Sequence, residues 1–456
     1  MYDVNPKRIL ALRRVMDNPQ CVARMDRMLA AMKKDRRSVA VLDDLQIPQA
    51  IRESGWVAGT RQGALDNRKD PDIVFSAFTW PTKEEKTKIL QGKLYQDCIG
   101  SFRSAGGSVS ESGPRWTQAL LGCSDHFHYE RRPEWKPDQV CWSLHDLHSA
   151  WGCLHRCSYC ARGGLYVIML NVEEFIEHVD GLMAEHPWQK VLRYDVEQDC
   201  LAIEPEYGAS RMLVEHFAEL EDKYLILFSK SANVDFLLDL DHKGHTIMLW
   251  TLSSHDVSRQ IEPKTGTMEQ RIEAARKCQE AGYTVRFKCK PVIPLKNWRE
   301  QTTHMLETLF SVLKPDNLSM EVVFFAGGVA EMDQVLGVSA FDEDVVAACR
   351  KAEESGPWDQ RANGPRPFPF EVKREVYRHF LTEARRLSPE TPVTLCAETQ
   401  RMWDACGDLI SMKPWNYVCN CGPHCTPRRR AIENIEGPDA ARIAKAVAAR
   451  AIPPAN

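Results

Sequence analysis

Residues 153–160 read Cys153-Leu-His-Arg-Cys157-Ser-Tyr-Cys160, and this stretch indicates both the fold and the chemistry of the chain. It follows a run rich in β-forming residues, at 140–147, so three thiols lie just past the end of a predicted strand. Three thiolates bind three irons of a four-iron cube and leave the fourth iron open. A structural zinc ion is the alternative, although closed zinc sites usually show two paired C-x2-C units.

Around this motif, predicted strands alternate with predicted helices. We expect strands at residues 140–147, 190–195, 224–229, 246–253, 284–291 and 318–325. We expect the helices between them at residues 172–186, 209–220, 232–240, 268–281 and 298–313. This alternation predicts an α/β fold, a partial (β/α)6 TIM-like barrel with its chemistry at the carboxyl ends of the strands. An open doubly wound sheet is the alternative.

Helix-end signals agree with this pattern. Thr267 and Gln270 predict a capping box at the start of the fourth helix, and Gly282 stands where a glycine would end it. Asn171 with Glu174 predicts a similar start for the first helix.

The composition and charge limit the classes of protein to which the chain can belong. The net charge is −4 and the isoelectric point is near 6.4, so no global positive field indicates nucleic acid. We find no apolar run of membrane-spanning length and no signal peptide, and we expect a cytoplasmic protein without a membrane partner. The expected regions are an N-terminal extension at 1–138, the barrel at 139–330, a C-terminal region at 331–435 and an Ala-rich tail at 436–456.

The C-x3-C-x2-C spacing, with Tyr159 before the last cysteine, resembles the defining motif of the radical S-adenosylmethionine (SAM) superfamily. The resemblance implies a partial barrel in which a [4Fe-4S] cluster is held by Cys153, Cys157 and Cys160. It also implies that the open iron binds SAM, whose reductive cleavage gives a 5′-deoxyadenosyl radical that abstracts hydrogen from a substrate. A flavodoxin or a ferredoxin is the electron donor that it implies.

Downstream blocks resemble the spore photoproduct lyase branch of that superfamily, at residues 228–237, 249–254 and 261–266. This resemblance implies that SAM is contacted by Ser229, Lys230 and Thr251. An ammonium can pair with the SAM carboxylate, and a hydroxyl can bind its polar groups. A surface lysine and a strand-forming threonine are the ordinary alternatives.

The loop after the second predicted strand carries further candidates. Glu197 stands where radical SAM enzymes often bind the SAM amino group, although an acidic loop is commonly just solvated. Cys200 aligns with the cysteine that returns a hydrogen atom to the product radical in the lyases, and a small buried hydrophobe is the alternative. Tyr159 is the remaining member of a tyrosine relay, because Ala161 stands where the lyases carry a tyrosine.

A second group of cysteines lies between residues 396 and 425. We expect a second metal site there, an Fe–S cluster ahead of zinc, with ligands from Cys406, Cys419, Cys421 and Cys425. A set of cysteines that binds no metal is the alternative.

The resemblance implies a lyase or isomerase that acts on a thymine-type nucleobase, in DNA or as a nucleoside. Basic residues expected on the barrel rim for such a substrate are Lys264, Arg286, Lys288 and Lys290. Two alternatives stay open: radical modification of a peptide or small metabolite, and a non-enzymatic zinc-containing protein that binds nucleic acid.

Overall fold

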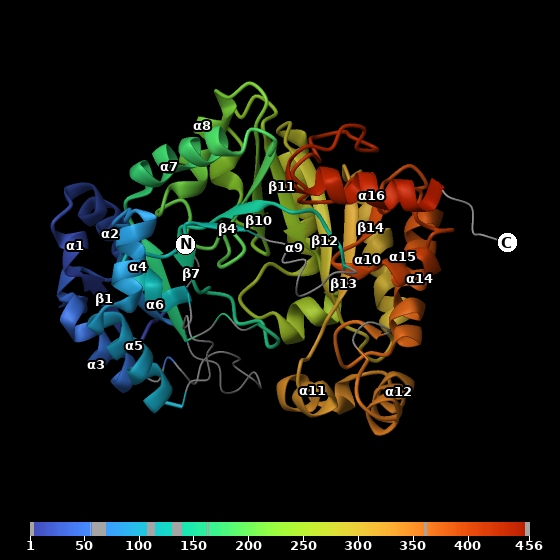
Figure 1. The fold of residues 1–456 in the computed structure, drawn as a ribbon, viewed down its shortest axis with the longest axis horizontal. Helices are drawn as coiled ribbons and strands as arrows, with labels where there is room; N and C mark the ends of the chain where they lie inside the picture. The colour runs from blue at the N-terminus through green and yellow to red at the C-terminus, as the bar shows by residue number, and fades with distance from the viewer. Residues whose placement is uncertain are drawn as a thin grey trace.

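The structure is a computed structural model that describes residues 4–451 except 55, 57–69, 107–114, 130–138, 161, 163 and 360–362. Two sheets lie side by side in the described part (Figure 1). The N-terminal sheet has the strand order β2 (Val39–Leu42), β1 (Ile9–Leu12), β3 (Asp72–Ser76), β8 (Leu165–Met169) and β7 (Ala150–Trp151). Its pairings are parallel except that of β7 with β8.

Helices pack around this first sheet, and its strands β1, β3 and β8 are buried along their whole length. The helices of this part are α1 (Arg13–Met16), α2 (Pro19–Ala31), α3 (Ile47–Ser54), α4 (Lys83–Gln91), α5 (Lys93–Ser104) and α6 (Arg115–Leu120). Continuous burial on both faces is what parallel strands covered by helices require.

The second sheet is the curled, parallel half-barrel that the sequence predicts. Its strand order is β14 (Val393–Leu395), β13 (Leu318–Val322), β12 (Thr284–Val292), β11 (Thr246–Thr251), β10 (Tyr224–Ser229), β9 (Val191–Tyr194), β6 (His145–Leu147) and β4 (Phe127–Tyr129). All neighbours pair in parallel except β4 with β6. The strand β14 was not predicted and lengthens the sheet past β13. A separate pair joins β5 (Gln139–Val140) to β15 (Glu398–Thr399).

Four of the five predicted helices form, as α7 (Val172–Glu185), α8 (Ala209–Ala218), α9 (Met268–Glu280) and α10 (Trp298–Val312). The predicted helix at 232–240 is wrong, because only a short 3-10 turn, Asp235–Leu237, is present. Asn233 instead donates its side-chain amide to the carbonyls of Leu201 and Glu204, at 3.1 and 2.7 Å. These bonds hold the segment along the neighbouring loop.

The predicted capping box of α9 is confirmed: the Thr267 hydroxyl accepts from the Gln270 amide at 3.3 Å, and the Gln270 side chain accepts from the Thr267 amide at 2.9 Å. Gly282 follows the helix with a φ of +93°, as an end-of-helix glycine does. Asn171 precedes α7 without capping it. Its side-chain amide instead bonds both main-chain groups of Phe78, at 2.9 and 3.0 Å, and so joins the segments that follow β3 and β8, two neighbouring strands of the N-terminal sheet.

The C-terminal half adds α11 (Gly328–Leu336), α12 (Glu343–Glu354), α14 (Phe370–Leu387), α15 (Gln400–Ala405) and α16 (Ala440–Ala451). Strand pairing crosses two of the three region boundaries proposed from the sequence. After the cysteine loop the chain enters β8 of the N-terminal sheet, although this strand lies beyond residue 138. Likewise β14, beyond residue 330, completes the barrel sheet. Backbone hydrogen bonds between distant segments determine the sheet to which each of these two strands belongs. The sequence pattern does not specify such bonds.

Candidate active site

A cavity of about 340 Å³ opens at the carboxyl ends of the barrel strands. The structure brings into its wall most of the site residues predicted from the sequence: Cys153, Cys157, Tyr159, Cys160, Glu197, Ser229, Lys230 and Thr251. They come from the loop before β8 and from the ends of β9, β10 and β11. This volume falls in the range of small-molecule sites.

The cysteine loop is fixed to the barrel by main-chain bonds. The amides of Arg156 and Ser158 donate to the carbonyls of Pro263 and Ile261, at 3.1 and 2.9 Å. Within the loop, the His155 amide donates to Cys153 Sγ at 3.4 Å. The Arg162 amide likewise donates to Cys160 Sγ at 3.3 Å. Such N–H···S contacts are those that stabilise thiolates bound to a cluster.

Two thiols of the loop are held neutral when no cation is near. Burial, above all, raises the pKa of Cys153 well above its ordinary value and that of Cys157 to about 12. A bound metal centre supplies the positive charge that releases such protons.

The donor set fits a cluster better than a single ion. Within the described residues, no three Cys, His, Asp or Glu side chains gather closely enough to hold one metal ion. In a cubane each thiolate binds a different iron, so its ligands surround the cluster without meeting at a point. Three cysteines of one loop line the same cavity, as the ligands of one cluster must.

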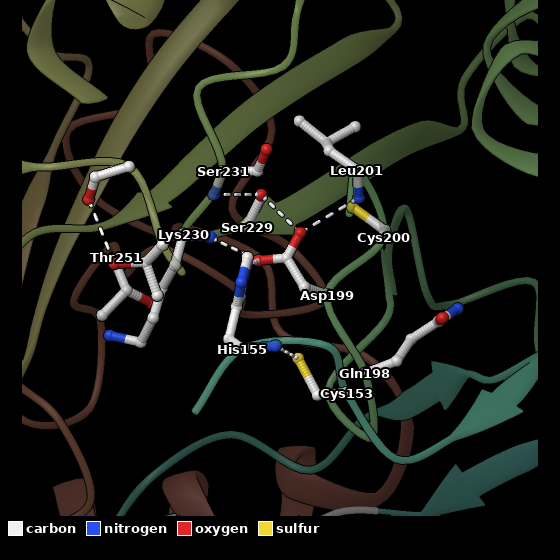
Figure 2. Close-up of polar contacts among 12 residues, drawn as sticks. Cys153, His155, Gln198, Asp199, Cys200, Leu201, Ser229, Lys230, Ser231 and Thr251 are labelled. Carbon is white, nitrogen blue, oxygen red and sulfur yellow. Dashed lines mark hydrogen bonds and ion pairs between the residues drawn. The ribbon is translucent and has the colours of Figure 1, made fainter. Parts of the chain in front are cut away.

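Asp199 organises the strand ends below the cysteine loop (Figure 2). Its carboxylate accepts from the Ser229 hydroxyl at 2.8 Å and from the Lys230 amide at 2.6 Å. Nε2 of His155 lies 3.0 Å from the same carboxylate. Burial raises the pKa of Asp199, but His155 and these hydrogen bonds outweigh it and hold the pKa below the ordinary value. Asp199 therefore links the cysteine loop to β10.

Glu197 lies on the cavity wall, and its carboxylate is already paired. Arg115 Nη1 is 2.7 Å from Oε1, and Arg162 forms an ion pair with Oε2. The Glu197 side chain is 6% exposed, so the carboxylate is buried beneath two partly exposed arginines and is not part of a solvated acidic loop.

Glu262 is a site residue that the sequence analysis missed. Its carboxylate accepts from Lys230 Nζ at 2.9 Å, Arg271 Nη2 at 2.6 Å and the Ser253 hydroxyl at 2.9 Å. The Tyr159 hydroxyl donates to it as well. Burial opposes the charge, but Lys230 and Arg271 lower the pKa of Glu262 to about 2. The signal was present in the 261–266 block, where Glu262 is the acidic residue directly before Pro263.

The structure does not bring every candidate to the cavity. Cys200 is 1% exposed and does not line the wall, and its thiol donates to the Phe228 carbonyl at 3.3 Å. Ala161 lies outside the described residues. Arg286, expected on the rim, is instead fully buried at the opposite end of β12, because the inward-facing row of the strand continues down to the barrel base.

Residues 419–425, which carry three of the C-terminal cysteines, lie at the amino-terminal end of the barrel strands, across the barrel from the cavity. There the Pro423 carbonyl accepts from the amides of Lys190 and Val191, at 2.9 and 3.0 Å. Arg286 donates to the carbonyls of Asn420 and Cys425, at 3.0 and 2.7 Å. In Figure 1 this segment, in red, lies at the end of β11 and β12 away from α11 and α12.

Three of the four predicted ligands of the second site lie together. The Cys419 amide donates to Cys425 Sγ at 3.3 Å, and the thiol of Cys421 is hydrogen-bonded to that of Cys419. Cys406 is buried elsewhere, at the end of α15, where its charged neighbours are Arg378 and Asp408. Its separation has a simple reason: Cys406 packs in the core with the helix that carries it.

No helix in the described part of the chain is both long and apolar enough to cross a bilayer.

Comparison with known proteins agrees with this geometry. The family described as "Spore photoproduct lyase" matches residues 144–326. The spore photoproduct lyase of Bacillus subtilis (strain 168) is 30% identical over 183 residues, which cover 38% of this chain and 53% of that protein. The Clostridium acetobutylicum lyase is 25% identical over 194 residues, covering 41% and 58%. The chain thus spans about half the length of the curated relatives it matches.

Solved structures share the fold over a longer stretch. A spore photoproduct lyase point mutant superposes with a TM-score of 0.57 at 14% identity, covering 86% of this chain and 99% of that one. A double mutant of the lyase with bound AdoMet and dinucleoside spore photoproduct gives 0.56 at the same identity and coverage. The predicted resemblance to the spore photoproduct lyase branch and the predicted barrel are both confirmed.

Proposed function

We propose that this chain is a radical SAM enzyme that acts on a thymine-type nucleobase lesion of DNA. The observation that carries the proposal is the shared cavity: the three cysteines of one loop face the same space as Lys230 and the ends of parallel strands. The match of residues 144–326 to the spore photoproduct lyase family supports the chemistry, and the relative solved with AdoMet and dinucleoside spore photoproduct supports the substrate class.

In this proposal Cys153, Cys157 and Cys160 hold a [4Fe-4S] cluster. When bound, the cluster and SAM supply a carbon-centred radical that abstracts hydrogen from the substrate. The protein's own part is to orient SAM and the substrate and to exclude water from the cavity. Lys230 presents an ammonium to the carboxylate of SAM, and Glu262 fixes that ammonium from below. Ser229 and Thr251 add hydroxyl groups at the ends of β10 and β11.

Tyr159 and Glu197 take supporting roles in the proposal. The Tyr159 ring lies 5.9 Å from Lys230 Nζ, in a cation–π contact, so the aromatic residue of the motif holds the same ammonium. Glu197, paired with Arg115 and Arg162, ties the loop after β9 to the N-terminal part and to the cysteine loop. A flavodoxin or ferredoxin is the proposed electron donor.

The test is anaerobic incubation of the reduced protein with SAM and DNA that contains spore photoproduct. We expect 5′-deoxyadenosine together with loss of the lesion, measured by mass spectrometry. Formation of deoxyadenosine without any change in the lesion would support the radical chemistry but contradict the proposed substrate class. Peptides or small metabolites would then be the next substrates to test.

A further inference from the structure

The cavity has a cationic floor, formed by the inward row of β12. Side chains alternate along a strand, and Val285, Phe287 and Cys289 face the core outside the barrel. Arg286, Lys288 and Lys290 therefore face the interior, one above another. Lys288 and Lys290 line the cavity.

The cations around Lys288 already have partners. Arg286 Nη2 lies 2.8 Å from Asp316, and Lys290 Nζ lies 2.6 Å from Glu321. Arg193, on β9, forms a two-pronged pair with Asp146 at 2.8 and 2.6 Å. Lys230 is paired with Glu262.

Lys288 differs from these neighbours. It is 4% exposed, yet within the described residues its Nζ makes no hydrogen bond and no ion pair. The ordinary pKa of a lysine ammonium is about 10.4, so Lys288 is expected to carry a charge at neutral pH. Burying an unpaired ammonium is costly, and an anion in the cavity would remove the cost.

The nearest acidic side chain, Glu321, does not provide that anion, because Lys290 Nζ already lies 2.6 Å from its carboxylate.

We infer that Lys288 forms an oxyanion-binding floor of the cavity, which receives a phosphate group of the substrate. Lys230 is paired with Glu262, whereas Lys288 has no such partner among the described residues, and this difference separates the two roles. A substrate that carries phosphate, such as a nucleotide or a nucleic acid, is thereby selected over a neutral nucleoside. That the substrate carries a nucleobase rests on the proposed function. That the cavity binds an anion at Lys288 does not.

The experiment measures equilibrium binding of radiolabelled inorganic phosphate to the anaerobic protein, without reductant. We expect one site per chain, lost or weakened by about tenfold or more in Lys288→Met and retained in Lys288→Arg. The matched control is Lys314→Met, whose side chain is 83% exposed. Circular dichroism confirms that each variant is folded, and Lys288→Gln replaces Lys288→Met if the latter fails to fold. Retention of phosphate binding by a folded Lys288→Met or Lys288→Gln variant would overturn the inference.

Two further arms identify the source of the anion. Thymidine 5′-monophosphate is expected to displace the bound phosphate at least about tenfold more effectively than thymidine. If phosphate binding depends on Lys288 but the thymine nucleotide does not displace it, the anion site stands and the nucleobase proposal fails. SAM affinity is expected to be unchanged in Lys288→Met. A loss of SAM affinity in that variant would assign the floor to the SAM carboxylate and overturn its role in substrate binding.

Discussion

The ammonium of Lys230 lies 2.9 Å from Oε1 of Glu262, whose side chain is fully buried, while that of Lys230 is 16% exposed. Glu262 also receives Arg271, so one carboxylate fixes two cations at the point where β10 and β11 end. A lysine that binds the carboxylate of SAM must keep one orientation, and this pair provides it. The Glu262 carboxylate thus fixes the positions of the cations at this side of the cavity.

Glu262→Gln is expected to destabilise the fold by roughly 3–5 kcal/mol at pH 7, because Lys230 and Arg271 lose a buried counter-charge. The pKa of Glu262 is lowered from 4.5 to about 2, so its contribution is complete above about pH 4.5 and is lost as the pH falls toward 2. Urea denaturation of both proteins at pH 7 and at the lowest pH where both fold checks this.

The control for that measurement is Glu273→Gln, since Glu273 pairs with Arg276 at 2.7 Å on the helix surface. Exposed pairs of this kind contribute little. An equal loss of stability in the two variants, or a difference that grows as the pH falls, would contradict the role given to Glu262.

Cys157→Ala is expected to lose most of the iron of the first cluster and to stop SAM cleavage, because a buried ligand that faces the cavity is removed. Iron and sulfide analysis, together with deoxyadenosine assay, measures both effects. Cys278→Ala is the matched control, because Cys278 is equally buried but lies on α9. Continued deoxyadenosine formation by Cys157→Ala would refute the ligand role.

Cys200→Ala separates two interpretations of this thiol. Hydrogen return to the product predicts that SAM cleavage continues while the products change. A packing role predicts that neither changes, and we expect this result because Cys200 Sγ bonds the Phe228 carbonyl and does not line the cavity. Product analysis by mass spectrometry decides, and altered products with a normal rate of SAM cleavage would restore the hydrogen-donor role.

A second metal centre stays a prediction, with Cys419, Cys421 and Cys425 as the residues that lie together. If the centre exists, Cys421→Ala should lower the iron or zinc content and leave SAM cleavage by the first cluster measurable. Cys406→Ala should not change the metal content, because Cys406 is packed apart at the end of α15. Unchanged metal in Cys421→Ala would leave the cysteines as packing residues.

Local patterns were sufficient for much of this architecture. The β10 strand was predicted to the residue, and the Thr267 capping box formed as expected, because alternation and capping depend on neighbours in sequence. Likewise the cysteine spacing and the strand-end positions of Lys230 and Thr251 brought the cavity wall together.

Long-range pairing could not be predicted in this way. Nothing near β8 in the sequence tells that it pairs with β3, some 90 residues earlier, and the same holds for β14 with β13. Glu262 was missed because its role comes from the three elements that converge on it. Arg286 was misplaced because the strand pattern gives its face but not its depth in the barrel.

The radical chemistry is tested most simply by assaying 5′-deoxyadenosine after the anaerobic, reduced protein is incubated with SAM alone. We expect deoxyadenosine to accumulate with wild-type protein that contains iron and sulfide. Protein that contains zinc without iron or sulfide and yields no deoxyadenosine would rule out a radical SAM site.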